Sequence, residues 1–201
     1  MRKYRISRMR TTLGKEQAMQ RKIIGFGFDD EGDRVAFLDC GHRQHVRHDP
    51  PFINRPWTET PDGRAEMLGK TLNCVRCDQA EWPEHFVAYK QTPEFTETSI
   101  PPALRKDHST KPGIWARILV SEGLLRYRAP ALGIDREISP TVVGIVVPEV
   151  LHSVEPLGAV WFRVEFHRAS TDEVKVGTGA TTMREDQLLA ASLSPGAAAL
   201  S

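Results

Sequence analysis

The sequence lacks several features that would assign it to a specialised class. No window approaches the 18 consecutive apolar residues of a membrane helix, and no apolar segment follows the N-terminal basic residues, as it would in a secretory signal. Residues 25–27 (Gly-Phe-Gly) have neither the third glycine nor the following helix of a dinucleotide-binding loop. With 26% charged residues and a net charge of +1, we expect a soluble globular protein without a membrane partner. Without a secretory signal, and with cysteines at metal-ligand spacing, we expect the reducing cytoplasm as its compartment.

Positive charge is concentrated at the N-terminus. Residues 1–22 hold eight lysines or arginines against one acid, Glu16, which gives +7, so the remaining 179 residues carry −6. We predict a disordered leader over residues 1–21, with Met19 as an alternative start. An arm that binds nucleic acid is the less favoured interpretation.

All three cysteines lie in two short runs that are also rich in histidine. Cys40 begins one run, and Cys74 and Cys77 form the other at a spacing of two intervening residues. Thiolates and imidazoles suit a tetrahedral zinc ion, so we predict a closed site of three cysteines and one histidine. The alternatives are buried cysteines without a metal and, less favoured, a nucleophilic Cys40 activated by a histidine.

The histidine of this site is not fixed by spacing. His42 lies in the predicted turn beside Cys40, whereas His45 belongs to the returning strand. We favour His42 and keep His45 as the alternative.

The first folded module is predicted over residues 22–83 and is rich in β-structure. Alternating apolar residues predict strands near residues 24–28 and 34–48, and residues 60–69 predict a short helix with Thr60 as its N-cap and Gly69 at its end. Because so small a module has a thin apolar core, a structural zinc would supply stability. We expect a zinc-ribbon-like module.

About residues 19–82 resemble a short bacterial domain family of uncharacterised function. The matching positions are Gly25-Phe26, Val35-Ala36, Cys40-Gly41-His42, Gln44-His45-Val46-Arg47-His48, Pro50-Pro51, Arg55-Pro56-Trp57, Gly63-Arg64, Leu68-Gly69 and Cys74-x-x-Cys77. The resemblance implies that the cysteines and histidines act together, but it brings no established activity.

Four further residues of this matching region are not needed for a zinc site: Arg47, His48, Arg55 and Trp57. Two guanidiniums, an imidazole and an indole are suited to binding an anion or a base. The alternative, which we weigh equally, is that they pack the loop and pair with nearby acids.

After a linker at residues 84–90, residues 91–169 predict a compact all-β domain followed by a tail at residues 170–201. Apolar runs near 114–120, 124–128, 142–147, 151–155 and 160–167 are separated by turns containing Gly123, Pro148 and Gly158. In the last run both faces carry large side chains, which is typical of a β-barrel whose interior binds a ligand.

Residues 91–168 resemble the tellurite-resistance protein B-like cupin domain family. The matching positions are Thr92-Pro93, Phe95, Ile100-Pro101-Pro102-Ala103-Leu104, His108-Ser109-Thr110-Lys111, Gly113, Trp115, Gly123-Leu124-Leu125-Arg126-Tyr127, Pro148, His152, Val154-Glu155-Pro156-Leu157-Gly158 and Phe162-x-Val164-Glu165-Phe166. The resemblance implies a cupin-type β-barrel, a double-stranded β-helix in which His108 and His152 converge on a metal or ligand, and a homodimer formed through the barrel.

The chain departs from the usual cupin pattern at the metal site. Only His108 of the first motif is a suitable ligand, so the third ligand would be Glu165, His167 or Glu149. We weigh equally a second divalent metal there (zinc, iron or nickel) and histidines that only hydrogen-bond. The glycine-rich loop and βαβ alternation of a methyltransferase are absent from the sequence, so methyl transfer is not expected.

We therefore expect a mainly β, two-domain bacterial protein that binds a metal or a ligand, with a small molecule or oxyanion as partner and a role in tellurite-type oxyanion resistance. One alternative is a metal-dependent cupin enzyme, an oxygenase or isomerase using His108, His152 and Glu165. A second alternative is a regulator that binds nucleic acid through its zinc module and basic leader.

Overall fold

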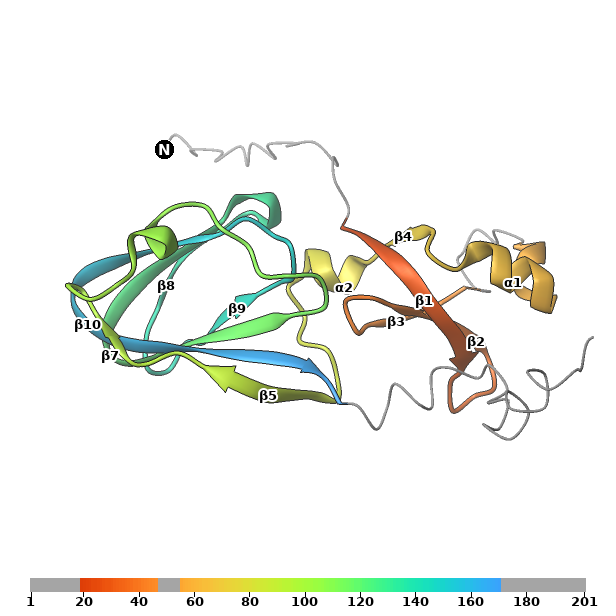
Figure 1. Cartoon of the computed structure of the whole chain (residues 1–201), viewed down its shortest axis with the longest axis horizontal. Coiled ribbons are helices and arrows are strands. Elements are labelled where there is room, and N and C mark those ends of the chain that lie inside the picture. Colours follow the sequence, from red (N-terminus) through yellow and green to blue (C-terminus); the bar gives the residue numbers. More distant parts are fainter. Residues whose placement is uncertain (1–18, 47–54, 171–201) are drawn as a thin grey trace, which may run out of the picture.

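The computed structural model describes residues 19–46 and 55–170, which form two β-rich parts lying side by side (Figure 1). The predicted leader (residues 1–21) and tail (residues 170–201) fall almost wholly outside these residues, as do Arg47 and His48. Among the described residues, none of the helices has the length and apolar character that crossing a bilayer requires.

The first part is built on a four-stranded antiparallel sheet in the order β3-β2-β1-β4. Its strands are β1 (Gln20–Phe28), β2 (Arg34–Leu38), β3 (Arg43–His45) and β4 (Thr71–Asn73). Ile23 of β1 lies opposite Leu38 of β2, and alternation puts Ala36 on the same face of the sheet as Leu38, so all three side chains are buried in the interior. This agrees with the predicted strands, except that β1 begins inside the predicted leader.

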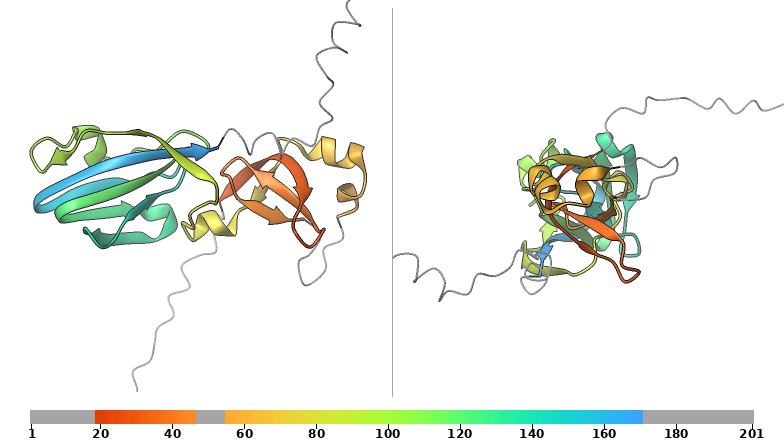
Figure 2. Two further views of the ribbon diagram at one scale, coloured as in Figure 1. Left: turned by 90° about the horizontal axis from the view of Figure 1, so that it is seen from below. Right: turned by 90° about the vertical axis from the view of Figure 1, so that its right-hand side faces the viewer.

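Among the described residues of this part there are also three short helices: η1 (Pro56–Thr58), α1 (Pro61–Met67) and α2 (Val75–Asp78). The Thr60 hydroxyl accepts a hydrogen bond from the Gly63 amide at 3.1 Å, and Gly69 adopts φ +78° just beyond the helix. These observations confirm the predicted helix and both of its end signals. Helix α2 lies where the two parts meet (Figures 1 and 2).

The second part is one six-stranded antiparallel sheet. Its two long strands are β7 (Trp115–Ala129) and β10 (Ser153–Ala169), which pair along most of their length. Strands β5 (Phe86–Gln91) and β6 (Phe95–Thr96) pair with β10, and strands β8 (Ile134–Ile138) and β9 (Gly144–Val146) pair with β7. The helices η2 (Pro102–Arg105) and η3 (Pro130–Leu132) lie in connections.

Two predicted turns are bulges inside long strands. Gly123 and Gly158 both have positive φ, yet β7 and β10 continue through them, and their register shifts where Gly123 pairs with Val160. A glycine with positive φ accommodates a bulge as readily as a turn.

The predicted linker at residues 84–90 is also wrong, because residues 86–91 form strand β5. Most of its residues are exposed, so the strand carries no buried alternation that a sequence pattern could indicate.

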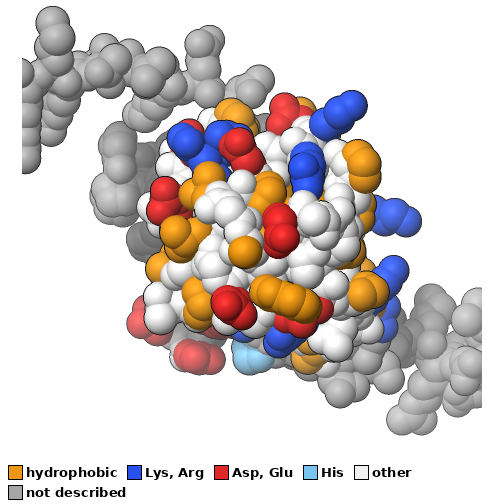
Figure 3. Space-filling view, turned by 90° about the vertical axis from the view of Figure 1, so that its left-hand side faces the viewer, with side chains coloured by type: hydrophobic (Ala, Val, Ile, Leu, Met, Phe, Trp, Pro, Cys, Tyr) orange, Lys and Arg blue, Asp and Glu red, His pale blue; other side chains and the backbone are white. Residues whose placement is uncertain are grey.

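At the end of the second part that faces away from the first, hydrophobic side chains lie among charged ones of both signs (Figure 3).

Candidate metal centre and ligand pocket

The first half of the metal centre comes from the turn between β2 and β3. The Gly41 amide donates to the Leu38 carbonyl at 2.8 Å, and the Leu38 amide donates to the His42 carbonyl at 3.0 Å. Gly41 adopts φ +89°, a conformation that glycine reaches without strain. This tight turn brings Cys40 and His42 to the interior, where they are 0% and 1% exposed.

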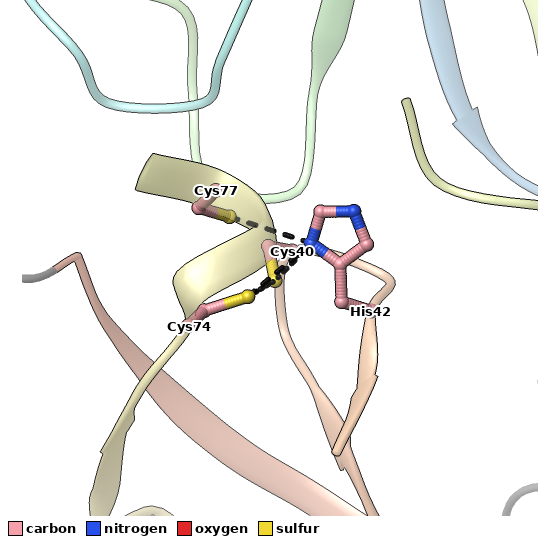
Figure 4. Close-up of side chains that lie close together, drawn as sticks. All are labelled: Cys40, His42, Cys74 and Cys77. Carbon is pink, nitrogen blue, oxygen red and sulfur yellow. Dashed lines mark hydrogen bonds between the residues drawn. The ribbon is translucent and has the colours of Figure 1, made fainter. Parts of the chain in front are cut away.

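The second half comes from the junction of β4 and α2. Cys74 is the N-cap residue of α2, and the Cys77 amide donates to the Cys74 carbonyl at 3.0 Å. This single helical turn places the thiols of Cys74 and Cys77 on the same side, where they face Cys40 and His42 of the β2–β3 turn (Figure 4). None of the three cysteines of the chain forms a disulfide.

The four ligand atoms converge with the spacing of a tetrahedron. The His42 Nδ1 atom lies 3.6 Å from the Sγ of Cys40, 3.3 Å from that of Cys74 and 3.5 Å from that of Cys77, and the Cys40 and Cys74 sulfurs are 3.8 Å apart. Zinc bond lengths of about 2.3 Å to sulfur and 2.0 Å to nitrogen imply separations of about 3.8 Å and 3.5 Å between tetrahedral ligands. Cys40, His42, Cys74 and Cys77 can therefore hold a metal ion.

The other ring nitrogen of His42 fixes its tautomer. Its Nε2 lies 3.1 Å from the Glu81 carbonyl oxygen, which can only accept, so Nε2 carries the hydrogen and Nδ1 presents its lone pair to the sulfurs. His45, the alternative ligand, is half exposed and its Nε2 lies 3.3 Å from Asp29. The structure thus places His42, not His45, with the cysteines.

The crowded thiols resist carrying more than one negative charge. Hydrogen bonds from the Cys40 and Cys77 thiols lower the pKa of Cys74, while contact with the Cys74 sulfur raises the pKa of Cys40. A hydrogen bond from Cys40 lowers the pKa of Cys77, but contact with Cys74 and burial raise it more, to about 12. A cation at the centre would stabilise all three thiolates, which is what metal binding supplies.

The metal centre lies against the second part of the protein. The indole Nε1 of Trp115, the first residue of β7, donates to the Cys40 carbonyl at 2.8 Å, and its ring meets the His42 ring edge-on at 5.4 Å between centroids. Trp82 packs on the same indole at 5.8 Å, and the Arg117 guanidinium lies 4.1 Å above the Trp82 ring. No sequence pattern indicated this contact.

Arg21 forms a second link between the parts. It is 3% exposed, and it donates to the Glu149 carboxylate at 2.8 Å and to the Pro148 carbonyl at 2.7 Å. Burial lowers the pKa of Arg21, but the nearby Cys77 and Cys40 sulfurs and Glu149 raise it more. The charge pattern of the sequence places this residue in the leader, because an isolated arginine carries no sign of burial.

The second candidate site is a cavity of about 430 Å³ in the second part. His108 and His152 both line it, their rings 4.1 Å apart between centroids, and their backbones pair in a short β-bridge. The structure therefore brings these two predicted residues together, with mostly apolar side chains of β7 and β10 around them.

The three candidate third ligands lie elsewhere. Glu165 accepts from Arg163 at 3.2 Å, on the face of β10 opposite to the cavity-lining Val164 and Phe166. His167 is buried against Trp82 at 4.8 Å between ring centroids, and Glu149 pairs with Arg21. The structure thus offers two imidazoles at the cavity and no carboxylate among the residues that line it.

The predicted anion-binding group is described only in part. Trp57 packs on Phe26 with ring centroids 5.8 Å apart, and the Arg55 carbonyl accepts from the Thr58 amide and hydroxyl at 3.0 and 2.9 Å. These contacts support the packing alternative for Trp57. Arg47 and His48 lie outside the described residues.

Fold and site together define a mainly β, two-part protein with a buried Cys3His centre that can hold a metal ion. Residues 24–81 match the family described as Protein of unknown function (DUF3565), and residues 90–164 match the TehB-like domain. Two consecutive segments of the chain thus match the two families that the resemblances predict. A search of curated proteins finds no match.

Solved structures with similarity include TehB from Haemophilus influenzae, at 24% identity and a TM-score of 0.40, over 56% of this chain and 42% of that chain. A protein from E. coli (strain K12) shows 20% identity and a TM-score of 0.40, over 44% of this chain and 96% of that chain. The chain thus spans less than half the length of TehB.

Proposed function

We propose that this protein binds a structural zinc ion in its first part and a small molecule or oxyanion in its second. The observation that carries the zinc assignment is the tetrahedral spacing of four buried ligand atoms. Three sulfurs and one nitrogen form a closed, soft donor set that suits zinc and leaves no position for a substrate. The ion would join two chain segments that otherwise have a small apolar core.

For the second part we propose a cupin-type double-stranded β-helix around the cavity. The long antiparallel strands β7 and β10, the convergence of His108 and His152, and the match to the TehB-like domain support this arrangement. The same match supports a role in resistance to oxyanions of the tellurite type. Three reduced thiols favour a reducing compartment such as the cytoplasm, and a homodimer through the second part stays a prediction.

The cavity supports binding better than turnover. A catalytic metal held by protein needs about three ligands and an open position, and His108 and His152 are the only metal-ligating side chains among the described residues that line the cavity. A second divalent metal at these two histidines would therefore be held weakly. An oxygenase or isomerase reaction would need a third ligand that the described lining of the cavity does not supply.

The test is elemental analysis of the full chain, purified without chelators, by inductively coupled plasma mass spectrometry. We expect about one zinc per wild-type chain, loss of that zinc in Cys74→Ser, and its retention in the matched control His45→Gln. His152→Ala should retain the same content; a separate loss there would show a second metal in the cavity. Wild-type protein without metal would overturn the zinc assignment.

A further inference from the structure

The chemistry of the cavity lining restricts what it binds. Of its 17 lining residues, ten are apolar or aromatic, two are lysines (Lys90 and Lys111) and none is acidic. An inorganic oxyanion would leave the apolar walls in contact with water, so the occupant needs an apolar body. The cavity volume of about 430 Å³ lies within the range of small-molecule sites.

The lysines supply the charge that the occupant must balance. Neither Lys90 nor Lys111 forms an ion pair with any described residue, and both ammonium-bearing side chains border the cavity. Because the lining holds no carboxylate, a bound acid group would meet no like charge among the residues that line the cavity. A carboxylate on the ligand is the complementary group.

His152 supplies a second, different requirement. It is 3% exposed, and its Nδ1 donates to the Val150 carbonyl at 2.9 Å, so the neutral ring presents Nε2 as an acceptor. Nε2 has no hydrogen-bond partner among the described residues, although its ring lines the cavity. An unpartnered acceptor that is open to the cavity favours a ligand that carries a donor, such as a hydroxyl group.

We propose that the cavity binds a small hydroxyl-bearing organic acid with an apolar chain, its carboxylate facing Lys111 and Lys90 and its hydroxyl donating to His152 Nε2. This inference rests on the proposed function of the cavity as a ligand pocket.

The test compares three probes that differ by one group: 2-hydroxyoctanoate, octanoate and 1,2-octanediol. Affinity is measured by isothermal titration calorimetry on the zinc-loaded full chain, and the location by the ring proton signals of His108 and His152 in nuclear magnetic resonance spectra. We expect 2-hydroxyoctanoate to bind about tenfold more tightly than either other probe and to shift both histidine signals.

Matched variants separate the two contacts. Lys111→Met should weaken binding of the acid about tenfold and leave that of the diol unchanged, whereas the same substitution at exposed Lys70, in the first part, should change neither. His152→Phe should remove the advantage of the hydroxy acid over octanoate.

Equal affinities of the diol and the two acids would overturn the acid class while leaving the pocket intact. If tellurite alone shifts the histidine signals, the occupant is an inorganic oxyanion and the inference is wrong. If no probe and no oxyanion shifts them, the ligand-binding half of the proposed function fails as well, while zinc content still tests the other half.

Discussion

The indole of Trp115 donates a hydrogen bond to the carbonyl of Cys40 at 2.8 Å, and both residues are 0% exposed. The bond joins the first residue of β7, in the TehB-like sheet, to a residue of the metal centre. Ile23, Leu38 and the three cysteines of the first part also share one buried cluster with Trp115 and the interior of the second. The two parts thus share a core, and we expect them to unfold together.

Trp115→Phe removes this bond and leaves a buried carbonyl without its donor. We expect the free energy of unfolding to fall by about 1–3 kcal/mol, in a single transition, as measured by urea denaturation. Trp161→Phe on β10, where the side chain is 46% exposed, is the control and should change little. Equal effects of the two substitutions would mean that the contact between the parts contributes nothing.

Gly41→Ala should destabilise the protein more than Gly32→Ala. Both glycines have positive φ, +89° and +83°, so both alanines carry a strain of about 1–2 kcal/mol. A Cβ at Gly41 would also collide with the Phe86 ring of β5, whereas nothing lies within 4 Å of a Cβ at Gly32. Thermal unfolding should therefore show a larger loss at position 41, partly restored by Phe86→Leu. A loss of the same size at both positions would argue against close packing of Phe86 on the metal-binding turn.

Buried Arg21 and half-exposed Glu149 should be energetically coupled. Arg21→Met leaves the Pro148 carbonyl without its donor, and Glu149→Gln leaves a buried guanidinium without its carboxylate, so each should lower the free energy of unfolding. Because Glu149 is 48% exposed, we expect a coupling energy of only about 0.5–1.5 kcal/mol in a double-mutant cycle.

The exposed pair Arg126 and Asp135 gives the control cycle, in which solvent screening should make the coupling smaller. If the changes in the free energy of unfolding at positions 21 and 149 were strictly additive, the ion pair between the two parts would contribute nothing to stability.

His152 should make stability depend on pH in the acid range. Burial lowers its pKa from 6.5 to about 4, so above pH 6.5 the ring is neutral in both the folded and the unfolded protein. Between pH 6.5 and 4 the unfolded state binds a proton that the folded state does not, and stability falls with falling pH by about 3 kcal/mol at most.

Urea denaturation at pH 7 and pH 5 measures this effect in wild type and in His152→Gln, which should lose less stability between the two values. The exposed His85, substituted in the same way, should leave the wild-type dependence unchanged. A His152→Gln protein with the full wild-type pH dependence would assign the effect to other groups, His167 first among them, because burial lowers its pKa also.

The sequence by itself predicts the ends of one helix and the three cysteine ligands of the metal centre. Thr60 and Gly69 delimit α1 because capping depends on a few neighbouring residues. Cys40, Cys74 and Cys77 can be grouped from sequence alone because few residue types bind soft metal ions and all three cysteines lie in two short runs, whereas the choice of His42 over His45 comes from the structure.

Only the tertiary structure decided which glycines end a strand and which side chains pack against the metal centre and the cavity. Gly123 and Gly158 become bulges because β7 and β10 find each other as partners on both sides of them, which no local pattern reveals. Strand pairing directs Glu165 away from the cavity, and packing between the parts buries Arg21 and Trp115. Residues far apart in sequence decide each of these outcomes. The helix caps depend on neighbouring residues, and the cysteine ligands can be recognised from their residue type and the short runs in which they lie.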